Sequence, residues 1–527
     1  MTDDEAPPID RPSWIRRHWH ELSAVVVAAA LRLPGVFNGL PYVNHPDEPV
    51  NYDYFHRMVY TPTVKPGFYV YPSLQYDIQA GVHWAVGHVG KWFGQWNSMA
   101  DLGYHPGRAD GSALVMQSEP WVAARLVTLA VTCVAVVVAV RIATRLTSSQ
   151  WWGFGGGLLL AVSTIGIVNG KLITPDALAG TTALLVLACL LRLLEPGAVV
   201  PNHRWVIGAG VVMGLALGSK YNNGLLFVAL GLAVWLATPD HRPTLRQLLA
   251  LTGIAGVVFL VTTPAVFLDT RLFIDDVKSL LDHYGSSHAG ADDNALLAQG
   301  RYLWPGEAIT LVGAAAAVLW SRRRPVWLLA GWVVGYVLLL SVPNVHFARN
   351  LTPVLGALAV LGAVGGQQLW WRVRAVAVER RMPSAVQALL LGAFVVATLV
   401  AAGTQLWRTQ HEVRHDLVNH QALSRDWLEG VVPTDAVVLA EAYSPWLDRN
   451  VWTVNNVRTM PYADPEAVAG ADVILITSTA SGRFEGRDDK YPGEVAFLRE
   501  VRDGACDIQR FDDGWGYWVE VVFQRCD

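Results

Sequence analysis

Hydrophobic residues form long, almost uninterrupted runs over the first 405 positions of the chain. An α-helix needs about 20 apolar residues to cross a membrane whose hydrocarbon core is roughly 30 Å thick, and eleven runs approach that length. They are 21–37, 120–142, 152–169, 175–193, 205–219, 223–238, 247–266, 306–320, 326–342, 351–370 and 384–404. The pattern predicts a polytopic α-helical membrane protein with about 11 transmembrane helices.

The pattern changes after residue 405. Residues 406–430 have helical spacing, and a further helix is expected at about 493–501. Short strand-like runs follow one another at 436–440, 451–457, 473–477, 508–511 and 517–523. The uninterrupted apolar run VILIT at 473–477 is typical of a strand that is buried on both faces. We therefore expect a transmembrane catalytic domain over 1–405 and an extracytoplasmic α/β domain over 406–527.

Two segments between the apolar runs, 38–119 and 267–305, are too long to be simple connectors. Loops of this length are usually functional. In the first of them, 49–59 and 74–89 are amphipathic, so we expect helices there that lie in the plane of the membrane interface.

Composition and charge agree with this division. Apolar residues make up 52% of the chain and charged residues only 16%, against about 25% in soluble proteins. These values exclude a disordered protein, a nucleic-acid binder with a basic face and an ordinary cytosolic enzyme. Residues 406–527 hold 21 of the 44 acids and 12 of the 40 bases, so this tail carries −9 and the rest of the chain +5.

The distribution of cations among the short loops predicts the orientation. Most arginines lie at one set of helix ends, whereas the opposite short loops hold only Lys171, Lys220 and Arg349. Because cytoplasmic loops are enriched in Lys and Arg, we expect a cytoplasmic N-terminus and an external tail. The first run could instead be a cleaved signal peptide, but the alternation of cations requires it to be retained. Arginine outnumbers lysine 34 to 6, a bias associated with GC-rich bacteria, which suggests a multi-pass protein of a bacterial plasma membrane.

The four cysteines fall into two groups. Cys133 and Cys189 lie inside apolar runs, where a thiol is usually a small apolar filler. Cys506 and Cys526 flank a predicted hairpin that turns near 512–514, almost symmetrically, so they could face each other across it. Outside the cytosol such a pair would form a disulfide; two unlinked thiols are the alternative.

Two adjacent carboxylates, Asp47 and Glu48, follow the first run in the segment NHPDEPVNY. Carboxylates held at a membrane surface suit the removal of a proton from a hydroxyl group, because burial can tune their pKa. The alternative is a solvated helix N-terminus, since Pro46 precedes them and acids favour the first helical turn.

A third acid, Asp176, opens the fourth run on the same side of the membrane, in KLITPDAL. It could be an ordinary N-terminal cap behind Pro175. Acids that border transmembrane segments are nevertheless rare and usually functional, and the topology would allow Asp176 to converge with Asp47.

Four cations lie on the side of the membrane that normally has few, at Lys65, Arg125, Lys220 and Arg349. A single such residue is usually a snorkelling surface cation. Together, four positive charges could bind a lipid phosphate and stabilise it as a leaving group.

The second long loop contains LLDHYGSSHAG, in which small residues surround His283, Tyr284 and His288. This composition favours a mobile lid over the site, with an ordinary external connector as the alternative. The histidines lie near Asp292 and Asp293, but the spacing is not specific for a metal, and we expect no cofactor.

Several motifs together resemble the GT-C glycosyltransferases, and within them the group of protein O-mannosyltransferases and aminoarabinose transferases (glycosyltransferase families 39 and 83) of bacterial membranes. HPDE and Tyr52 in the first outer loop resemble the acidic signature of this superfamily. The other motifs follow in order as PGFYVYPSL, EPWVAARLVTL, KLITPDAL, LALGSKYNNGLL, VHFARNLTPVLGALA and, in the tail, ADVILITS and YPGEVAFL. The chain departs from the family pattern at Tyr71–Ser73, where a proline pair is usual, and at Asn350, where an aromatic is common.

The resemblance implies roles at the matching positions. Asp47 would be the general base that activates the acceptor hydroxyl, and Glu48 would orient it or the loop. Asp176 would help to hold the acceptor or the loop. The residues implied in substrate binding are Arg125, Lys220 and Arg349 at the phosphate, with Lys65, Tyr52, His283 and Tyr284 as further candidates. The donor would be a polyprenyl-phosphate sugar, and the sugar would be transferred in one displacement with inversion to a hydroxyl of a protein, a cell-wall glycan or a lipid.

The main competing function is a polytopic transporter or lipid-linked sugar flippase, because helical bundles with buried ions often move solutes. Two features argue against it: the chain has no evident repeat at half its length, and the acids border the outer surface instead of lying near mid-membrane. A scaffold or receptor is a third class, which the paired acids and opposing cations make less attractive.

Overall fold

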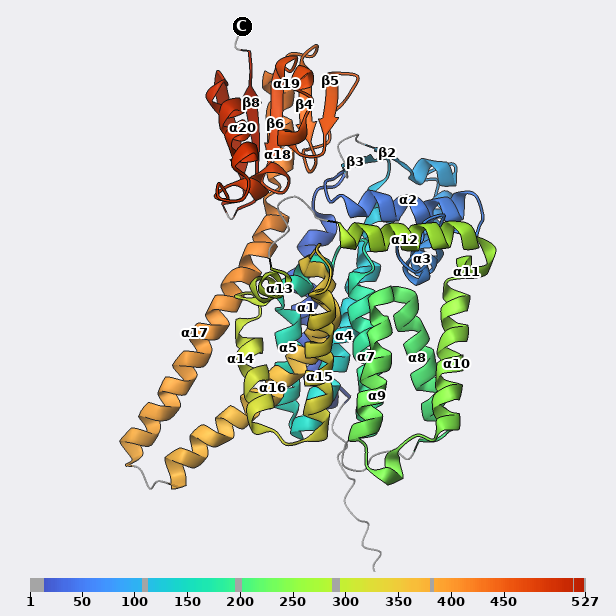
Figure 1. Cartoon of the computed structure of the whole chain (residues 1–527), viewed down its shortest axis with the longest axis vertical. Coiled ribbons are helices and arrows are strands. Elements are labelled where there is room, and N and C mark those ends of the chain that lie inside the picture. Colours follow the sequence, from blue (N-terminus) through green and yellow to red (C-terminus); the bar gives the residue numbers. More distant parts are fainter. Residues whose placement is uncertain are drawn as a thin grey trace, which may run out of the picture.

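The computed structural model describes residues 14–106, 112–194, 201–286, 294–379, 383–514 and 516–525. Twelve helices correspond to the eleven predicted apolar runs (Figure 1). They are α1 (Trp14–Phe37), α4 (Ser118–Thr147), α5 (Gln150–Ala161), α6 (Thr164–Asn169), α7 (Asp176–Leu191), α8 (His203–Ser219), α9 (Leu226–Leu236), α10 (Leu245–Thr262), α14 (Ala308–Trp320), α15 (Arg324–Leu340), α16 (Thr352–Glu379) and α17 (Ser384–Leu417).

The third predicted run is two helices and not one. α5 ends at Ala161, and Ser163 begins α6 by accepting a hydrogen bond from the backbone N–H of Gly166. The Ser163 hydroxyl also donates to Glu307 over 2.6 Å. The interruption therefore has a physical cause, a helix cap whose hydroxyl is also bound to a distant carboxylate.

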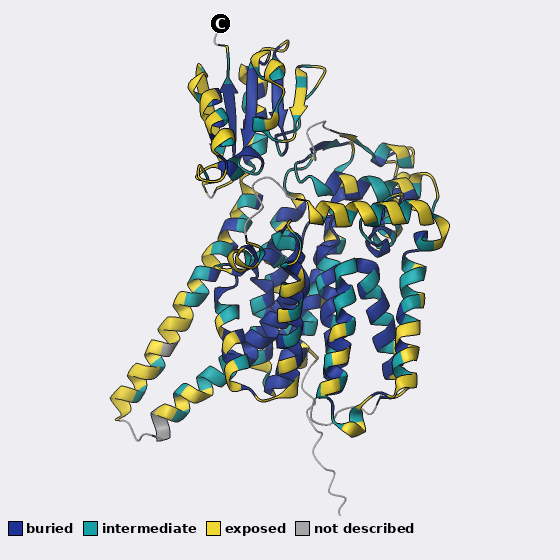
Figure 2. Ribbon diagram, viewed as in Figure 1, coloured by how far each residue is buried: buried dark blue, intermediate teal, exposed yellow. Residues whose placement is uncertain are grey.

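By length and composition, five helices within the described ranges could cross a membrane, or six if the bent pair 295–303 and 308–320 forms one span. α7, α15 and the segment Tyr221–Leu236 are apolar but shorter. The predicted count of eleven spans therefore stays a prediction. Much of α17 is exposed (Figure 2). Its exposed residues include the apolar Leu389, Val396 and Leu399, as expected of side chains that face lipid.

Small residues allow the central helices to approach closely. A Cβ atom built on Gly365 of α16 would lie 1.8 Å from the carbonyl oxygen of Gly313 in α14, so a larger residue cannot fit there. Packing of small residues is a usual way for membrane helices to associate, because lipid offers no hydrophobic driving force between them.

Short elements from the two long loops cover one end of these helices, the end predicted to face outward (Figure 1). The first loop holds α2 (Asp47–Tyr60), α3 (Leu74–Trp92), η1 (Met99–Leu102) and the strands β1 (Tyr42–Val43), β2 (Tyr104–Pro106) and β3 (Ala113–Val115) in the order β1-β3-β2. The second holds α11 (Ala265–Leu268), α12 (Thr270–Gly285) and α13 (Ala295–Leu303). Helices thus occupy both segments predicted to be amphipathic, whereas the small sheet was not predicted.

The tail folds around a five-stranded sheet with the order β5-β4-β6-β8-β7. Its elements are α18 (His420–Val431), β4 (Val437–Glu441), β5 (Thr453–Val457), α19 (Pro465–Ala469), β6 (Val473–Thr477), α20 (Pro492–Asp503), β7 (Asp507–Asp512) and β8 (Trp518–Phe523). Strands β4, β5 and β6 are parallel, whereas β8 is antiparallel to both β6 and β7.

Strand β6 is buried on both faces, as the VILIT run predicts. Ile474 and Ile476 pack in one apolar cluster with α20, while Val473 and Leu475 pack in another with α18. The predicted C-terminal α/β fold is therefore confirmed. α17 runs without a break across residues 405 and 406, and the proposed domain boundary at that point stays a prediction.

Candidate active site

A cavity of about 970 Å³ is lined by residues of the two long loops, of the neighbouring helix ends and of the C-terminal sheet. Its walls come from the first outer loop, the connection after α6, the segment before α16, the end of α17 and loops of the sheet. Of the predicted site residues, five line it: Asp47, Glu48, Arg125, His283 and Arg349.

Asp47 forms an ion pair with Arg349 in the cavity wall. Both side chains are partly exposed, the carboxylate by 30% and the guanidinium by 24%. Asp47 is the first residue of α2 and Arg349 lies in the short helix η4 (Ala348–Leu351). The pair therefore places a carboxylate and a cation side by side where a ligand can reach both.

Glu48 and Arg125 form a second ion pair, which is buried. Both terminal oxygens of Glu48 accept hydrogen bonds from Arg125, over 2.9 and 2.7 Å. Arg125 also donates to the carbonyl oxygens of Val36 and Asn38, and the backbone N–H of Ile173 donates to Glu48. These bonds join the first outer loop to α4 and to the connection between α6 and α7.

Burial alone would raise the pKa of Glu48, but the Arg125 guanidinium holds it below its ordinary value. Burial lowers the pKa of the neighbouring His45 to about 4. At neutral pH the wall beside Asp47 therefore contains a charged Glu48 and a neutral imidazole.

Asp176 and Lys220 form a third ion pair, with Nζ of Lys220 2.7 Å from Oδ1 of Asp176. Lys220 also donates to the side-chain oxygen of Asn350 over 2.8 Å, and Asn350 donates to the hydroxyl of Tyr284. All of these groups except Tyr284 are buried, and none of them lines the cavity. Asp176 and Asp47 consequently do not share one surface.

Two predicted binding residues lie away from the cavity. Tyr52 is buried, stacks on Trp121 at 4.0 Å and donates its hydroxyl hydrogen to the carbonyl oxygen of Leu102. Lys65 is exposed in the segment between α2 and α3 and is not among the residues that line the cavity. The surroundings of Tyr52 are those of a core residue.

The remaining predictions fall partly outside the described residues. His288, Asp292 and Asp293 of the expected lid lie outside them, as does Cys526. Cys506 is disulfide-bonded. It immediately precedes the hairpin of β7 and β8, in which Asp507 pairs with Phe523.

The cavity also contains residues that the sequence did not single out. Lys171 forms an ion pair with Asp416 of α17, and both side chains are almost completely buried. The tail contributes the basic side chains Arg458 and Arg483, the histidines His415 and His420, and the aromatic residues Tyr443, Tyr462 and Tyr517. Lys171 was visible as a lone cation of an outer loop; the tail residues carried no motif, because their meeting depends on how the sheet lies over the helices.

The cavity thus contains an accessible carboxylate together with cationic and hydrogen-bonding groups. A carboxylate can accept a proton from a hydroxyl group, and arginine binds phosphate oxygens well because its planar fork presents several donors.

Comparisons with known proteins find one matching family and solved structures of similar fold. The sequence profile of the Dolichyl-phosphate-mannose-protein mannosyltransferase family matches residues 110–267, a segment that contains Arg125, Asp176 and Lys220 but neither Asp47 nor Arg349. No curated protein sequence matches the chain.

Among solved structures, ArnT from Cupriavidus metallidurans bound to undecaprenyl phosphate is 16% identical, with a TM-score of 0.51 over 97% of this chain and 98% of ArnT. The oligosaccharyltransferase AglB from Archaeoglobus fulgidus is 12% identical, with a TM-score of 0.45 over 96% of this chain and 74% of AglB. The resemblance to the GT-C glycosyltransferases indicated by the sequence motifs is thus confirmed, by the family profile over residues 110–267 and by a fold like that of ArnT over nearly the whole chain.

Proposed function

We propose that this protein is a membrane glycosyltransferase that moves a sugar from a polyprenyl-phosphate donor to an acceptor hydroxyl on the outer face of the membrane. The observation that carries the proposal is the ion pair of Asp47 and Arg349 in the wall of the large outer cavity. It offers a proton acceptor and a phosphate-binding cation next to each other. The lipid bound in the ArnT structure, undecaprenyl phosphate, supports the choice of donor class.

In this proposal Asp47 is the general base. It is the partly exposed acid of the HPDE segment, whereas Glu48 is fully buried and committed to Arg125. Asp47 takes the proton of the acceptor hydroxyl while the oxygen attacks the anomeric carbon. The bond from that carbon to the phosphate oxygen breaks, so the configuration inverts and polyprenyl phosphate leaves.

Among the cations that the sequence motifs identified, Arg349 is the one best suited to the donor phosphate. Arg125 already donates to Glu48 and to two backbone carbonyls, and Lys220 is bound to Asp176 and Asn350. We therefore infer that Arg125, Glu48, Lys220 and Asp176 position the protein segments around the site, since these side chains hydrogen-bond to other protein groups. The hydrogen bonds of Glu48 to Arg125 and Ile173 fix the segment from which Asp47 extends.

The acceptor would enter between the outer loops and the C-terminal sheet. Arg458, Tyr443 and Tyr462 line that side of the cavity. Aromatic faces and arginine donors suit a polar, hydroxyl-rich acceptor such as a glycan, although a protein or lipid hydroxyl has the same reacting group.

The test uses the purified full-length protein in detergent with a radiolabelled polyprenyl-phosphate sugar. We expect the donor to be consumed and polyprenyl phosphate to be released when an acceptor extract is supplied. A flippase would leave the donor intact in detergent and would move it only across sealed vesicles. If the donor stays intact in detergent but is moved across the membrane of sealed vesicles, the protein is a lipid transporter and not a glycosyltransferase.

A further inference from the structure

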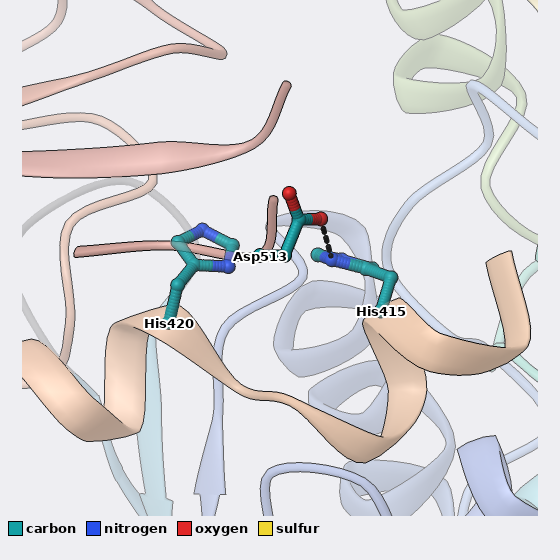
Figure 3. A group of neighbouring side chains, drawn as sticks. All are labelled: His415, His420 and Asp513. Atoms are coloured by element: carbon teal, nitrogen blue, oxygen red, sulfur yellow. Dashed lines mark hydrogen bonds and ion pairs between the residues drawn. The ribbon is translucent and has the colours of Figure 1, made fainter. Parts of the chain in front are cut away.

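Two histidines and an aspartate from three different elements meet beside the large cavity (Figure 3). His415 lies near the end of α17, His420 is the first residue of α18, and Asp513 follows β7 in the turn of the terminal hairpin. One potential ligand atom from each residue lies within 4.8 Å of the other two. None of these residues has a role in the proposed transfer reaction.

Neighbouring residues hold the side chains of Asp513 and His415 and the backbone at His420. Asp513 and Tyr517 exchange backbone and side-chain hydrogen bonds across the turn, with the N–H of Tyr517 donating to Oδ1 of Asp513 over 3.2 Å. The Tyr517 ring lies 4.6 Å from that of His415. Asn419 caps α18 by accepting from the N–H of Ala422 over 2.9 Å, which sets the start of the helix at His420. The turn of the terminal hairpin and the start of α18 therefore hold the cluster in place.

His420 carries the observation that points to a ligand. Its side chain is 94% buried, since only 6% is exposed, and its Nδ1 atom has no hydrogen-bond partner among the described residues. In Figure 3 the ring edge of His420 faces Asp513 and His415. Burial of an unpaired polar atom is unfavourable and calls for an explanation.

The contact between His415 and Asp513 agrees with a metal ligand set, in which a carboxylate often orients an imidazole. Nδ1 of His415 lies 2.9 Å from Oδ2 of Asp513, so the carboxylate that would bind the ion also orients an imidazole.

We propose that His415, His420 and Asp513 form a site for a divalent transition-metal ion, for which Zn²⁺ is the best match. Two imidazole nitrogens and one carboxylate oxygen are typical zinc ligands, and three protein ligands leave a position for water or another group. Zinc–nitrogen bonds of about 2.0–2.1 Å separate tetrahedral ligands by roughly 3.3 Å, so the three ligand atoms, which lie within 4.8 Å of one another, would draw closer together on binding.

Such an ion would join three elements that are separate in the chain. It would tie the end of α17 and the start of α18 to the β7–β8 turn, and so hold the C-terminal sheet against the last membrane helix. His415 and His420 also line the large cavity, which leaves the ion accessible from it. Metal binding at this site does not require sugar transfer.

The test is to titrate zinc into the chelator-treated, full-length protein in detergent and to measure binding by isothermal calorimetry. We expect one zinc ion per chain and at least about 100-fold weaker binding in His420→Ala, because loss of an outer hydrogen-bond partner alone often costs 10–100-fold. The control is His88→Ala, which removes an exposed imidazole whose Nδ1 contacts the carbonyl oxygen of Trp84 in its own helix α3. This variant should bind zinc like the wild type.

Two further measurements separate metal loss from misfolding. Zinc should raise the melting temperature of the wild type and of His88→Ala but not that of His420→Ala, because a ligand stabilises only the state that binds it. X-ray absorption at the zinc edge of the wild type should show two imidazole nitrogens. Absence of zinc binding by the wild type, equal binding by His420→Ala, or a spectrum without imidazole ligands would overturn the proposal and leave His415 and Asp513 as a structural pair.

Discussion

Asp47 and Arg349 are separated by 302 positions in the chain, yet they form an ion pair in the wall of the outer cavity. The pair brings together the start of α2, in the first outer loop, and η4, just before α16. If Arg349 binds the donor phosphate, the phosphate competes with Asp47 for the guanidinium. Donor binding would then release the carboxylate to accept the proton of the acceptor.

The first prediction concerns the base. Asp47→Asn should keep the fold but lower the rate of sugar transfer by about 10²–10⁴-fold, the usual effect of losing a positioned proton acceptor. Radiolabelled donor and purified protein provide the measurement. Asp53→Asn is the matched control, because Asp53 lies on the same helix and is paired with Arg57 outside the cavity. Wild-type turnover in Asp47→Asn would reassign the base.

The second prediction concerns the phosphate. Arg349→Gln should weaken donor binding, with a KM for the polyprenyl-phosphate sugar raised by roughly tenfold or more, because a charge-assisted hydrogen bond to phosphate is worth about 1.5–3 kcal/mol. Arg57→Gln, on α2 and 53% exposed, removes a similar charge and should leave the KM unchanged. If Arg349→Gln has the same KM as the wild type, another cation binds the donor phosphate.

The third prediction concerns the buried pair of Glu48 and Arg125. Glu48→Gln leaves the Arg125 charge uncompensated in a buried site, and loss of one partner of such a pair typically costs about 3–5 kcal/mol. A lower thermal midpoint in detergent is the expected readout. The double variant Glu48→Met, Arg125→Met should lose less than the sum of the two single variants. Strict additivity would mean that the two side chains do not act as a pair.

The fourth prediction is the pH dependence of this pair. The pKa of Glu48 lies below its ordinary value of 4.5, so the unfolded chain takes up the proton first as the pH falls. The contribution to stability is therefore complete above pH 4.5 and is lost as the pH drops through the native pKa. The difference in thermal midpoint between wild type and Glu48→Gln should stay constant from pH 8 to about pH 5 and narrow only below that. Narrowing near neutral pH would contradict the assigned shift.

The fifth prediction separates a positioning role of Asp176 from contact with the acceptor. Asp176→Asn and Lys220→Met should each lower the thermal midpoint, because each leaves a buried partner unpaired. The double variant Asp176→Asn, Lys220→Met should have a thermal midpoint closer to that of the wild type than either single variant. An Asp176→Asn protein with an unchanged midpoint and a raised acceptor KM would instead indicate direct contact with the acceptor.

The local patterns of the chain predicted much of the fold. Apolar runs marked the segments that became the membrane helices, the VILIT run marked a strand buried on both faces, and amphipathic spacing marked α2 and α3. These features depend on periodicity within a segment, which a sequence displays directly. The break between α5 and α6 was not predicted: it begins at the Ser163 cap, and the carboxylate of Glu307 that accepts from the Ser163 hydroxyl lies 144 positions away in the chain.

The chemistry of the site depended on partners far apart in the chain. HPDE, the arginine of VHFARN and the lysine of GSKYN identified charged residues that are predicted to lie on one side of the membrane, but not which of them pair. Only the tertiary structure decided that Asp47 meets Arg349 at the cavity, that Glu48 and Asp176 are held by Arg125 and Lys220, and that Tyr52 lies in the core.

The physical reason is the difference between local and long-range information. Hydrophobic periodicity and charge bias fix which segments enter the membrane and on which side a residue lies, because lipid and water act on each segment separately. Which carboxylate stays accessible is determined by the packing of several segments against one another. The same holds for His415, His420 and Asp513, whose encounter required the last membrane helix and the terminal hairpin to fold together.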